Sequence, residues 1–160
     1  MIFLTVGSQF SFDRLVKAID NLVDRGLISE KVFAQIGDST YKPRNFEYSA
    51  YLEKNAFDGY VRQASALIGH AGMGTITMAL SNRKALLAMP RLKRFHEVVN
   101  DHQVDIARRF SELGHILAAY NTEELTSVVP QLKIFIPKER KAEPEKVADR
   151  ISRFLDELRT

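Results

Sequence analysis

The sequence predicts an α/β domain with a doubly wound, Rossmann-like parallel sheet. Short apolar runs alternate with longer segments whose apolar residues recur at helical spacing, and no two-residue hairpin signal joins one run to the next. Runs that are apolar throughout are typical of strands buried on both faces, which requires helical crossovers and a parallel sheet. A length of 160 residues fits one domain, so we expect residues 1–160 to form a single unit.

The predicted strands are short runs rich in β-branched and other apolar residues, and most of them stop at a residue that breaks the pattern. Gly7 and Gly37 end the first two runs, and Pro90 ends the fifth. The strands are predicted at residues 2–6, 32–36, 46–51, 66–69, 85–89 and 116–119.

The predicted helices lie between and after these strands, where apolar residues recur three to four apart. Ser11 and Thr122 are expected to cap two of the helices, and Gly26 and Gly114 to end two. The helices are predicted at residues 12–23, 53–64, 75–80, 100–113, from 122 onward, and at about 144–159. The charged residues 138–145 precede or enter the last helix and are interrupted by Pro144, which predicts a linker.

Composition excludes several classes of function. The 23 Lys and Arg residues exceed the 20 Asp and Glu residues by only three, so a dedicated nucleic-acid binder is not expected. The absence of cysteine excludes disulfides, zinc–thiolate sites, thiol catalysis and iron–sulfur clusters. The apolar runs are too short to cross a bilayer, and the N-terminus lacks the pattern of a secretory signal. We therefore expect a soluble domain of a reducing compartment.

In an open parallel sheet, ligands bind beyond the carboxyl ends of the strands. This rule selects four loops, at residues 7–9, 35–37, 70–75 and 90–100. We call residues 7–9 the first glycine turn, residues 70–75 the second glycine turn, and residues 90–100 the basic loop.

The second glycine turn, His70-Ala71-Gly72-Met73-Gly74-Thr75, is the most informative of the four. Its glycines allow a ligand to approach the backbone, and Thr75 is expected to open a helix whose free amides and dipole suit a phosphate. The turn is not a P-loop, and Thr77 stands where a dinucleotide-binding motif would have its third glycine. A tight strand–helix turn with glycine for steric reasons alone remains an equal alternative.

The first glycine turn, Gly7-Ser8-Gln9, offers a hydroxyl, an amide side chain and an open backbone. Alone it is a weak signal. Together, the two turns would place flexible polar backbone around one crevice, which favours a diphosphate ligand.

Histidines and charged residues provide no separate catalytic motif. No two histidines have the i, i+4 spacing of a helical zinc site, so no metal is expected. Asp101 and His102 are adjacent and should point to different sides of a helix, and His70 is expected to pack or form a hydrogen bond at the end of its strand.

A group of basic residues follows the second glycine turn and is expected to be solvated surface. Its alternative role is attraction to anionic lipid head groups or phosphates. The group consists of Arg83, Lys84, Arg91, Lys93 and Arg94.

Three segments together resemble a known family. They are residues 70–75, the run Ala85-Leu86-Leu87-Ala88-Met89-Pro90-Arg91, and Glu97-Val98-Val99-Asn100-Asp101-His102-Gln103. Their order and spacing resemble the donor-binding, C-terminal domain of glycosyltransferase family 28. The resemblance covers nearly the whole chain. It is greatest to the short catalytic subunits of bacterial two-component exopolysaccharide glycosyltransferases, which are related to the soluble subunit of the dolichol-linked N-acetylglucosaminyltransferase.

The resemblance implies one half of a GT-B fold that binds a UDP-sugar donor as substrate, without a cofactor or metal. Ser8 and the amides of residues 72–75 would hold the diphosphate, Asp101 and Gln103 would reach the sugar hydroxyls, and other residues would line the pocket. The full set of donor-binding residues that it implies is Gly7, Ser8, Gln9, His70, Ala71, Gly72, Met73, Gly74, Thr75, Asn100, Asp101 and Gln103. Met78 stands where a related enzyme has a ribose-binding glutamate, which leaves Glu97 as a candidate for that contact.

The chain has length for only one of the two GT-B halves, so the resemblance also implies a partner. A membrane-anchored subunit would bind a polyprenyl-diphosphate-linked acceptor, supply the general base and complete an inverting hexosyltransferase for polysaccharide synthesis. The chain would then be cytoplasmic and peripheral to the inner face of the membrane. The alternatives are a non-catalytic nucleotide-sugar-binding or regulatory module and a plain interaction domain whose glycine turns are structural.

Overall fold

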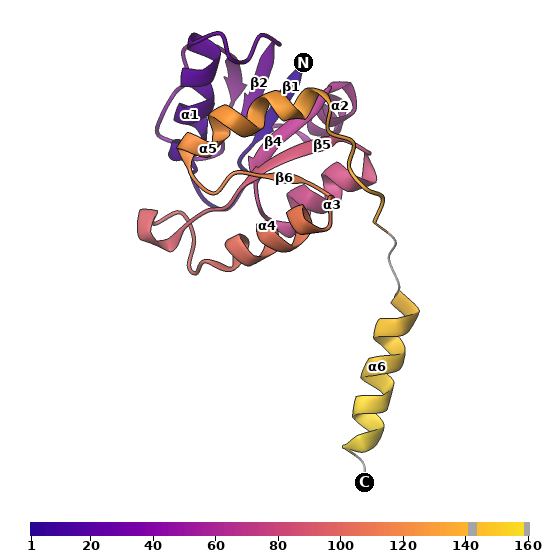
Figure 1. Cartoon of the computed structure of the whole chain (residues 1–160). Helices are drawn as coiled ribbons and strands as arrows, with labels where there is room; N and C mark the ends of the chain where they lie inside the picture. The colour runs from indigo at the N-terminus through magenta and orange to yellow at the C-terminus, as the bar shows by residue number, and fades with distance from the viewer. Residues whose placement is uncertain (141–143, 159–160) are drawn as a thin grey trace.

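The computed structural model describes residues 1–140 and 144–158, and its centre is a six-stranded sheet in which every pairing is parallel (Figure 1). The strand order is β3-β2-β1-β4-β5-β6. The strands are β1 (Ile2–Thr5), β2 (Val32–Gln35), β3 (Glu47–Ser49), β4 (Ala66–His70), β5 (Ala85–Met89) and β6 (Leu117–Ala118). The predicted doubly wound parallel α/β fold is therefore confirmed.

Helices connect successive strands and continue after the last one. The α-helices are α1 (Asp13–Asp24), α2 (Lys54–Gln63), α3 (Met73–Ser81), α4 (His102–Glu112), α5 (Thr122–Val128) and α6 (Pro144–Glu157). Two 3₁₀ helices are present, η1 (Lys93–Phe95) within the basic loop and η2 (Val129–Lys133) directly after α5.

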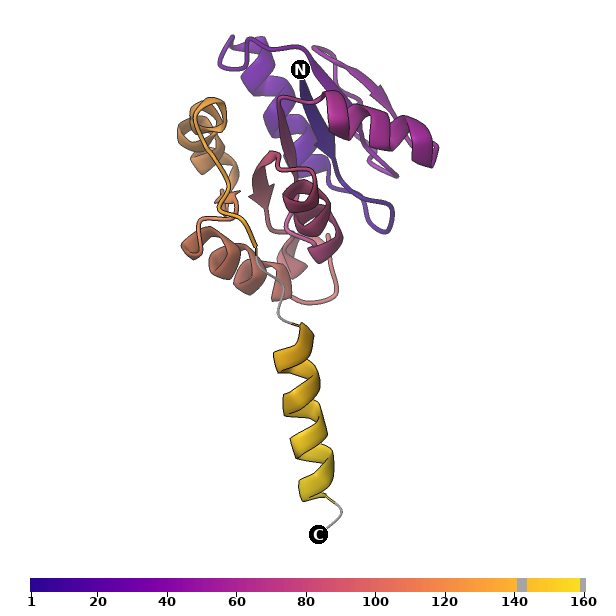
Figure 2. The same ribbon diagram turned by 90° about the vertical axis from the view of Figure 1, so that its right-hand side faces the viewer.

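The alternation of side chains along β1 shows how the sheet separates two cores. Ile2 and Leu4 pack with α1, α5 and η2, whereas Phe3 packs on the opposite face with α2, α3 and α4. In Figure 2, α5 and α2 lie on opposite sides of the sheet. Because strands β1, β2, β4 and β5 are nearly covered on both faces, their residues are apolar except at the carboxyl ends of β1, β2 and β4, where Thr5, Gln35 and His70 stand.

The chain reverses its direction of winding at β1. The connection from β1 leads outward to β2 and β3, and the chain then returns to place β4 on the other side of β1. Parallel sheets bind ligands at such a switch point, beyond the carboxyl ends of the strands. The first glycine turn follows β1 and the second follows β4, so adjacent strands deliver the two turns to the same edge.

Two predicted caps and one predicted helix start are wrong. Phe12, not Ser11, precedes α1 and donates its amide to the Ser39 hydroxyl at 3.2 Å. Helix α3 begins at Met73, so Thr75 lies within its first turn. Asn121 rather than Thr122 caps α5.

The cap of α5 is a reciprocal one. The side-chain oxygen of Asn121 accepts a hydrogen bond from the Glu124 amide at 2.9 Å. The Glu124 carboxylate in turn accepts a bond from the Asn121 side-chain NH₂ group and another from the Tyr120 amide, each at 2.7 Å.

Helix α6 extends away from the sheet domain in both views (Figures 1 and 2). Its apolar side chains are at least half exposed, from 50% for Leu155 to 67% for Leu158, which directly follows the helix. Part of the predicted linker, residues 141–143, lies outside the described residues, as does residue 159 of the predicted helix. Within the described chain, no helix combines the length and apolar character needed to span a membrane.

Candidate functional site

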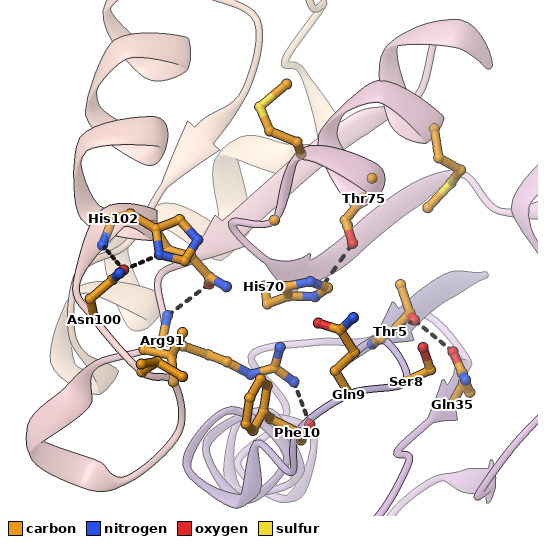
Figure 3. Close-up of a pocket in the computed structure, with 18 of the residues that line it drawn as sticks. Thr5, Ser8, Gln9, Phe10, Gln35, His70, Thr75, Arg91, Asn100 and His102 are labelled. Atoms are coloured by element: carbon orange, nitrogen blue, oxygen red, sulfur yellow. Dashed lines mark hydrogen bonds between the residues drawn. The ribbon is translucent and has the colours of Figure 1, made fainter.

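A cavity of about 670 Å³ lies at the carboxyl edge of the sheet, between the two glycine turns and the start of α4 (Figure 3). This volume is within the range of small-molecule pockets, which is roughly 300–1,000 Å³. The cavity is open to solvent on one side and lies at the switch point between β1 and β4.

The imidazole of His70 separates the two glycine turns. A Cβ atom added at Gly72 would lie 2.4 Å from His70 Nε2, and one added at Gly7 would lie 2.8 Å from His70 Cε1. Gly7 also has a φ of +77°, which favours glycine. Both glycines are therefore needed because the histidine ring fills the space that a side chain would occupy, and the ring sets the spacing of the turns.

His70 is held in a neutral state. Its Nδ1 lies 3.3 Å from Thr75 Oγ1, at hydrogen-bonding distance. Burial, reinforced by the positive charge of Arg91, lowers the pKa of His70 to about 4. At neutral pH the ring therefore acts as an uncharged spacer and hydrogen-bonding group.

This depressed pKa predicts a loss of stability in mild acid. The unfolded chain takes up a proton on His70 below about pH 6.5, whereas the folded chain resists protonation until about pH 4. Between these values the unfolded state binds more protons, so stability falls as the pH falls, by about 3 kcal/mol in total. Urea unfolding of the wild type, His70→Gln and His102→Gln at pH 7 and pH 4.5 measures this. A pH dependence in His70→Gln as steep as in the wild type would contradict the prediction.

The second glycine turn presents the N-terminus of α3. The first hydrogen bond within the helix runs from the Ile76 amide to the Gly72 carbonyl at 3.0 Å. The amides of residues 73–75 thus precede the helical ladder, as at any helix N-terminus, and the helix dipole adds partial positive charge there. Met73, Gly74 and Thr75 all line the cavity.

Amide side chains add further donors to the cavity. Gln103 Oε1 accepts a bond from the Arg91 amide at 3.1 Å, and Asn100 Oδ1 accepts one from the His102 amide at 3.2 Å. Gln35 Oε1 accepts from the Thr5 hydroxyl at 2.8 Å. With their oxygens engaged, these side chains retain NH₂ groups that can donate to a ligand.

The basic loop is attached to the domain by two buried side chains. Arg91 is only 2% exposed and lines the cavity, so the prediction that it belongs to a solvated basic surface is wrong. Glu97 forms two hydrogen bonds with Arg14, at 3.0 and 2.8 Å, and accepts a third from the Leu92 amide. Glu97 is therefore a structural residue and is not available for a ribose.

The structure brings most of the predicted site residues together. Those that line the cavity are Gly7, Ser8, Gln9, His70, Gly72, Met73, Gly74, Thr75, Asn100 and Gln103. Ala71 does not line it, because this residue is fully buried below the turn and its amide donates to the Met89 carbonyl. Asp101 does not line it either, because its carboxylate turns back to accept a bond from the Lys93 amide at 2.7 Å.

Several residues of the cavity were not among the predicted donor-binding residues, although four of them lie in the loops at residues 35–37 and 90–100 that the rule for parallel sheets selects. They are Thr5, Phe10, Gln35, Phe57, Met78, Arg91, Val98, Val99 and His102. Thr5 and Gln35 end neighbouring strands, a position that the rule for parallel sheets already marks. Phe57 comes from α2, and no signal in the sequence places its side chain at this edge.

No group of three or more His, Asp or Glu side chains in the described part of the chain is arranged to hold a metal ion. The nineteen residues that line the cavity include no Asp or Glu at all. The cavity is thus rich in hydrogen-bond donors and suits an anionic ligand.

A donor-rich cavity at the switch point of a doubly wound sheet defines a ligand-binding α/β domain of the Rossmann-like class. Comparison with known proteins gives the particular family. Residues 1–156 match the glycosyltransferase family 28 C-terminal domain, and the chain belongs to this family.

Curated relatives include the human UDP-N-acetylglucosamine transferase subunit ALG13. It is 28% identical over 124 residues, a match that covers 72% of this chain and 10% of the human protein. The chain spans between about a tenth and a half of the length of the curated relatives it matches.

Solved structures show the same fold. The glycotransferase of kitacinnamycin superposes with a TM-score of 0.62 at 20% identity, covering 83% of this chain and 34% of that one. The solution structure of ALG13 superposes with a TM-score of 0.59 at 16% identity, covering 91% of both chains. The chain therefore has the architecture of one half of a GT-B glycosyltransferase.

Proposed function

We propose that the chain binds the diphosphate of a UDP-sugar in the cavity and is the donor-binding subunit of a glycosyltransferase. The observation that carries the proposal is that the two glycine turns meet at His70. Both turns contribute to a cavity that is lined by no carboxylate. Helix N-termini and glycine turns bind phosphate groups by this arrangement. The name of the relative ALG13, a UDP-N-acetylglucosamine transferase subunit, supports the same donor class.

The proposed reaction is an inverting transfer of a hexosyl group. A hydroxyl group of the acceptor attacks the anomeric carbon, the bond from the sugar to the phosphate oxygen breaks, and the electron pair remains on the departing UDP. Preorganised donors stabilise the charge that develops on that phosphate, so the proposal uses no metal or other cofactor. The acceptor proton passes to a base.

We place that base in a partner subunit. His70 is a weak base, because its pKa is lowered to about 4, and its ring is enclosed between the glycine turns. The other histidine of the cavity, His102, has its Nδ1 bound to Asn100 Oδ1, and no carboxylate lines the cavity. The described residues form one α/β domain around a single sheet, whereas GT-B enzymes have two such domains. The partner would be membrane-anchored and would present a polyprenyl-diphosphate-linked acceptor during polysaccharide synthesis, with this chain on the cytoplasmic face.

Exposed apolar side chains among the residues that line the cavity support a covering partner. Phe10, Met73 and Val99 line the cavity and are 39%, 40% and 73% exposed. Contiguous exposed apolar groups at a pocket rim are typical of interaction sites. Closure by a partner would also exclude water from the donor.

Donor binding and transfer test the proposal separately. Calorimetry on the isolated chain should detect UDP, and UDP at about 100 times its dissociation constant should stabilise the fold by about 2.7 kcal/mol. Transfer from a panel of UDP-sugars should require the co-expressed partner. Absence of UDP binding would overturn the proposal. Robust transfer by the isolated chain would show that no partner is needed. UDP binding without sugar transfer, even by the chain together with its partner, would favour a non-catalytic module.

Helix α6 is the segment that we expect to hold the same partner. Its exposed apolar residues Val147, Ile151 and Phe154, with Leu158 after it, follow the 3–4 alternation of a helix-pairing seam. Acidic and basic residues are mixed along the helix, whereas helices that bind anionic lipid surfaces are rich in Lys and Arg. The occupant should therefore be a helix or apolar groove of the partner protein.

Charge substitutions in α6 test this docking. Ile151→Asp and Phe154→Asp should each abolish co-purification with the partner while leaving the melting temperature of the isolated chain within about 1 °C, because exposed substitutions change stability little. Ser152→Asp, on the other side of the helix, is the matched control and should retain the partner. Retention of the partner by both apolar-face variants would exclude α6 as the docking segment.

A further inference from the structure

Arg91 is a buried cation without an ion-pair partner in the part of the chain that the structure describes. Its side chain follows β5 and is 2% exposed, and among the described residues no carboxylate lies within ion-pairing distance of it. Its Nε atom is buried and has no hydrogen-bond partner in the described structure. Buried charges in proteins are normally paired, because desolvation without compensation is costly. The missing counter-charge therefore calls for an explanation.

The nearest candidate for that counter-charge is engaged elsewhere. Glu97 is on the same loop and favours the charged form of Arg91 through space, but both its oxygens bind Arg14. Burial lowers the pKa of Arg91 to about 10, which still leaves the guanidinium protonated at neutral pH. The side chain is thus charged and desolvated, and no ion pair within the described structure compensates its charge.

Contacts hold the guanidinium against the first glycine turn. One terminal nitrogen donates to the carbonyls of Val6 and Phe10, which flank the turn on either side. The rings of Phe12 and Phe10 lie 5.2 and 6.0 Å from the guanidinium carbon, at cation–π distance. Arg91 therefore fixes the conformation of the turn and cannot swing out to solvent without breaking these contacts.

The guanidinium also lies beside the space in which the two turns meet. Arg91 lines the cavity, and Figure 3 shows its side chain extending toward Phe10, with Gln9 and His70 on the cavity side. An anion bound to the amides of the two glycine turns would occupy the cavity that Arg91 lines and would be attracted by its charge. In such a desolvated site, attraction between unlike charges is stronger than in water and is weakly screened by salt.

We propose that Arg91 is the positioning and anion-specificity residue of the cavity, whose uncompensated charge is neutralised by the diphosphate of the bound donor while its hydrogen bonds hold the first glycine turn. The identification of the anion as the diphosphate of a sugar nucleotide rests on the proposed function. The arrangement explains why a guanidinium is buried without a carboxylate: the ligand is the counter-ion. It also links the order of the first glycine turn to the occupancy of the cavity.

The test compares charge with packing at position 91. Arg91→Met keeps much of the contact with the two phenylalanine rings but removes the charge, and Arg91→Lys keeps the charge but loses the planar fork. Lys93→Met, an exposed residue of the same loop, is the control for loss of a nearby positive charge. Affinities of the full chain for inorganic pyrophosphate, UDP and uridine are measured by calorimetry, and Arg91→Gln replaces Arg91→Met if that variant does not fold.

Arg91→Met should weaken the binding of pyrophosphate and UDP about 10- to 100-fold, the range for loss of a charged hydrogen-bonding group. It should weaken the binding of uridine by less than about two-fold. Arg91→Lys should recover part of the loss, and Lys93→Met should bind as the wild type does. A parallel NMR titration should show the His70 pKa rising in Arg91→Met, because the Arg91 charge lowers it.

Two outcomes separate this inference from the proposed function. Undiminished pyrophosphate and UDP affinity in Arg91→Met, or equal losses of uridine and UDP in both Arg91 variants, would overturn the role of Arg91 and leave the proposed function intact. Pyrophosphate binding that depends on Arg91, in a chain that does not bind UDP, would overturn the proposed function and retain an anion site at Arg91.

Discussion

Replacing Gly72 by alanine is expected to destabilise the domain and abolish UDP binding. The new Cβ would lie 2.4 Å from His70 Nε2, and the ring cannot retreat because Gly7 packs closely on its other side. Overpacking of this kind costs about 1–3 kcal/mol, which corresponds to a fall in melting temperature of roughly 2–12 °C for a domain of this size. Displacement of the ring would also move the two glycine turns apart, so the amides would no longer converge on one anion. Calorimetric melting and UDP titration measure both effects.

Gly74→Ala is the matched control, two residues along the same turn. A Cβ at Gly74 meets no atom within 4 Å, and alanine is favoured over glycine within a helix by about 0.5–1 kcal/mol. The fold should therefore be as stable as the wild type or more so. Since Gly74 lines the cavity, the added methyl group should still weaken UDP binding. If Gly72→Ala melted and bound UDP as the wild type does, the spacing role of His70 would be wrong.

Breaking the Arg14–Glu97 pair is expected to have the largest effect on stability. The two side chains are 16% and 8% exposed and are joined by two hydrogen bonds, and Arg14 also donates to the Pro90 carbonyl at 3.0 Å. Glu97→Gln leaves a mostly buried guanidinium without its counter-charge, which typically costs about 3–5 kcal/mol. Because this pair attaches the basic loop to α1, donor binding should weaken in parallel.

Glu47→Gln provides the comparison for a surface pair. Glu47 binds Lys31 at 3.0 Å, but these side chains are 69% and 64% exposed, and such pairs contribute about 0–1 kcal/mol. In urea unfolding, Glu97→Gln should therefore lose several times more unfolding free energy than Glu47→Gln. Equal losses would show that the Arg14–Glu97 pair does not anchor the loop.

The fold was predictable because its signals are local. Each buried strand is an apolar run, in three cases ended by a polar residue, and the helices between them repeat apolar residues at helical spacing. The family resemblance was equally readable, because its segments at residues 70–75 and 97–103 are contiguous motifs. Helix caps were less predictable, since the hydroxyl that receives the Phe12 amide belongs to Ser39, far away in the sequence.

The cavity was predictable in position but not in detail. Glycines at the ends of β1 and β4 indicate the two turns, because parallel strands bring their carboxyl ends to one edge. The direction of a side chain within an irregular loop carries no such rule. Asp101 and Gln103 are two residues apart, yet one binds the Lys93 amide away from the cavity and the other lines it.

By itself, the sequence determined the class of fold, the strands that meet at the switch point and the two turns that could receive a phosphate, because these depend on local propensity and on the geometry of parallel sheets. Only the tertiary structure decided that His70 separates the turns, that Glu97 pairs with Arg14, and that Arg91 is buried with no described carboxylate beside it. These contacts join residues distant in the chain, and burial of a charge depends on every element packed around it. A basic residue in a charged loop looks the same in sequence whether it faces solvent or an anion site.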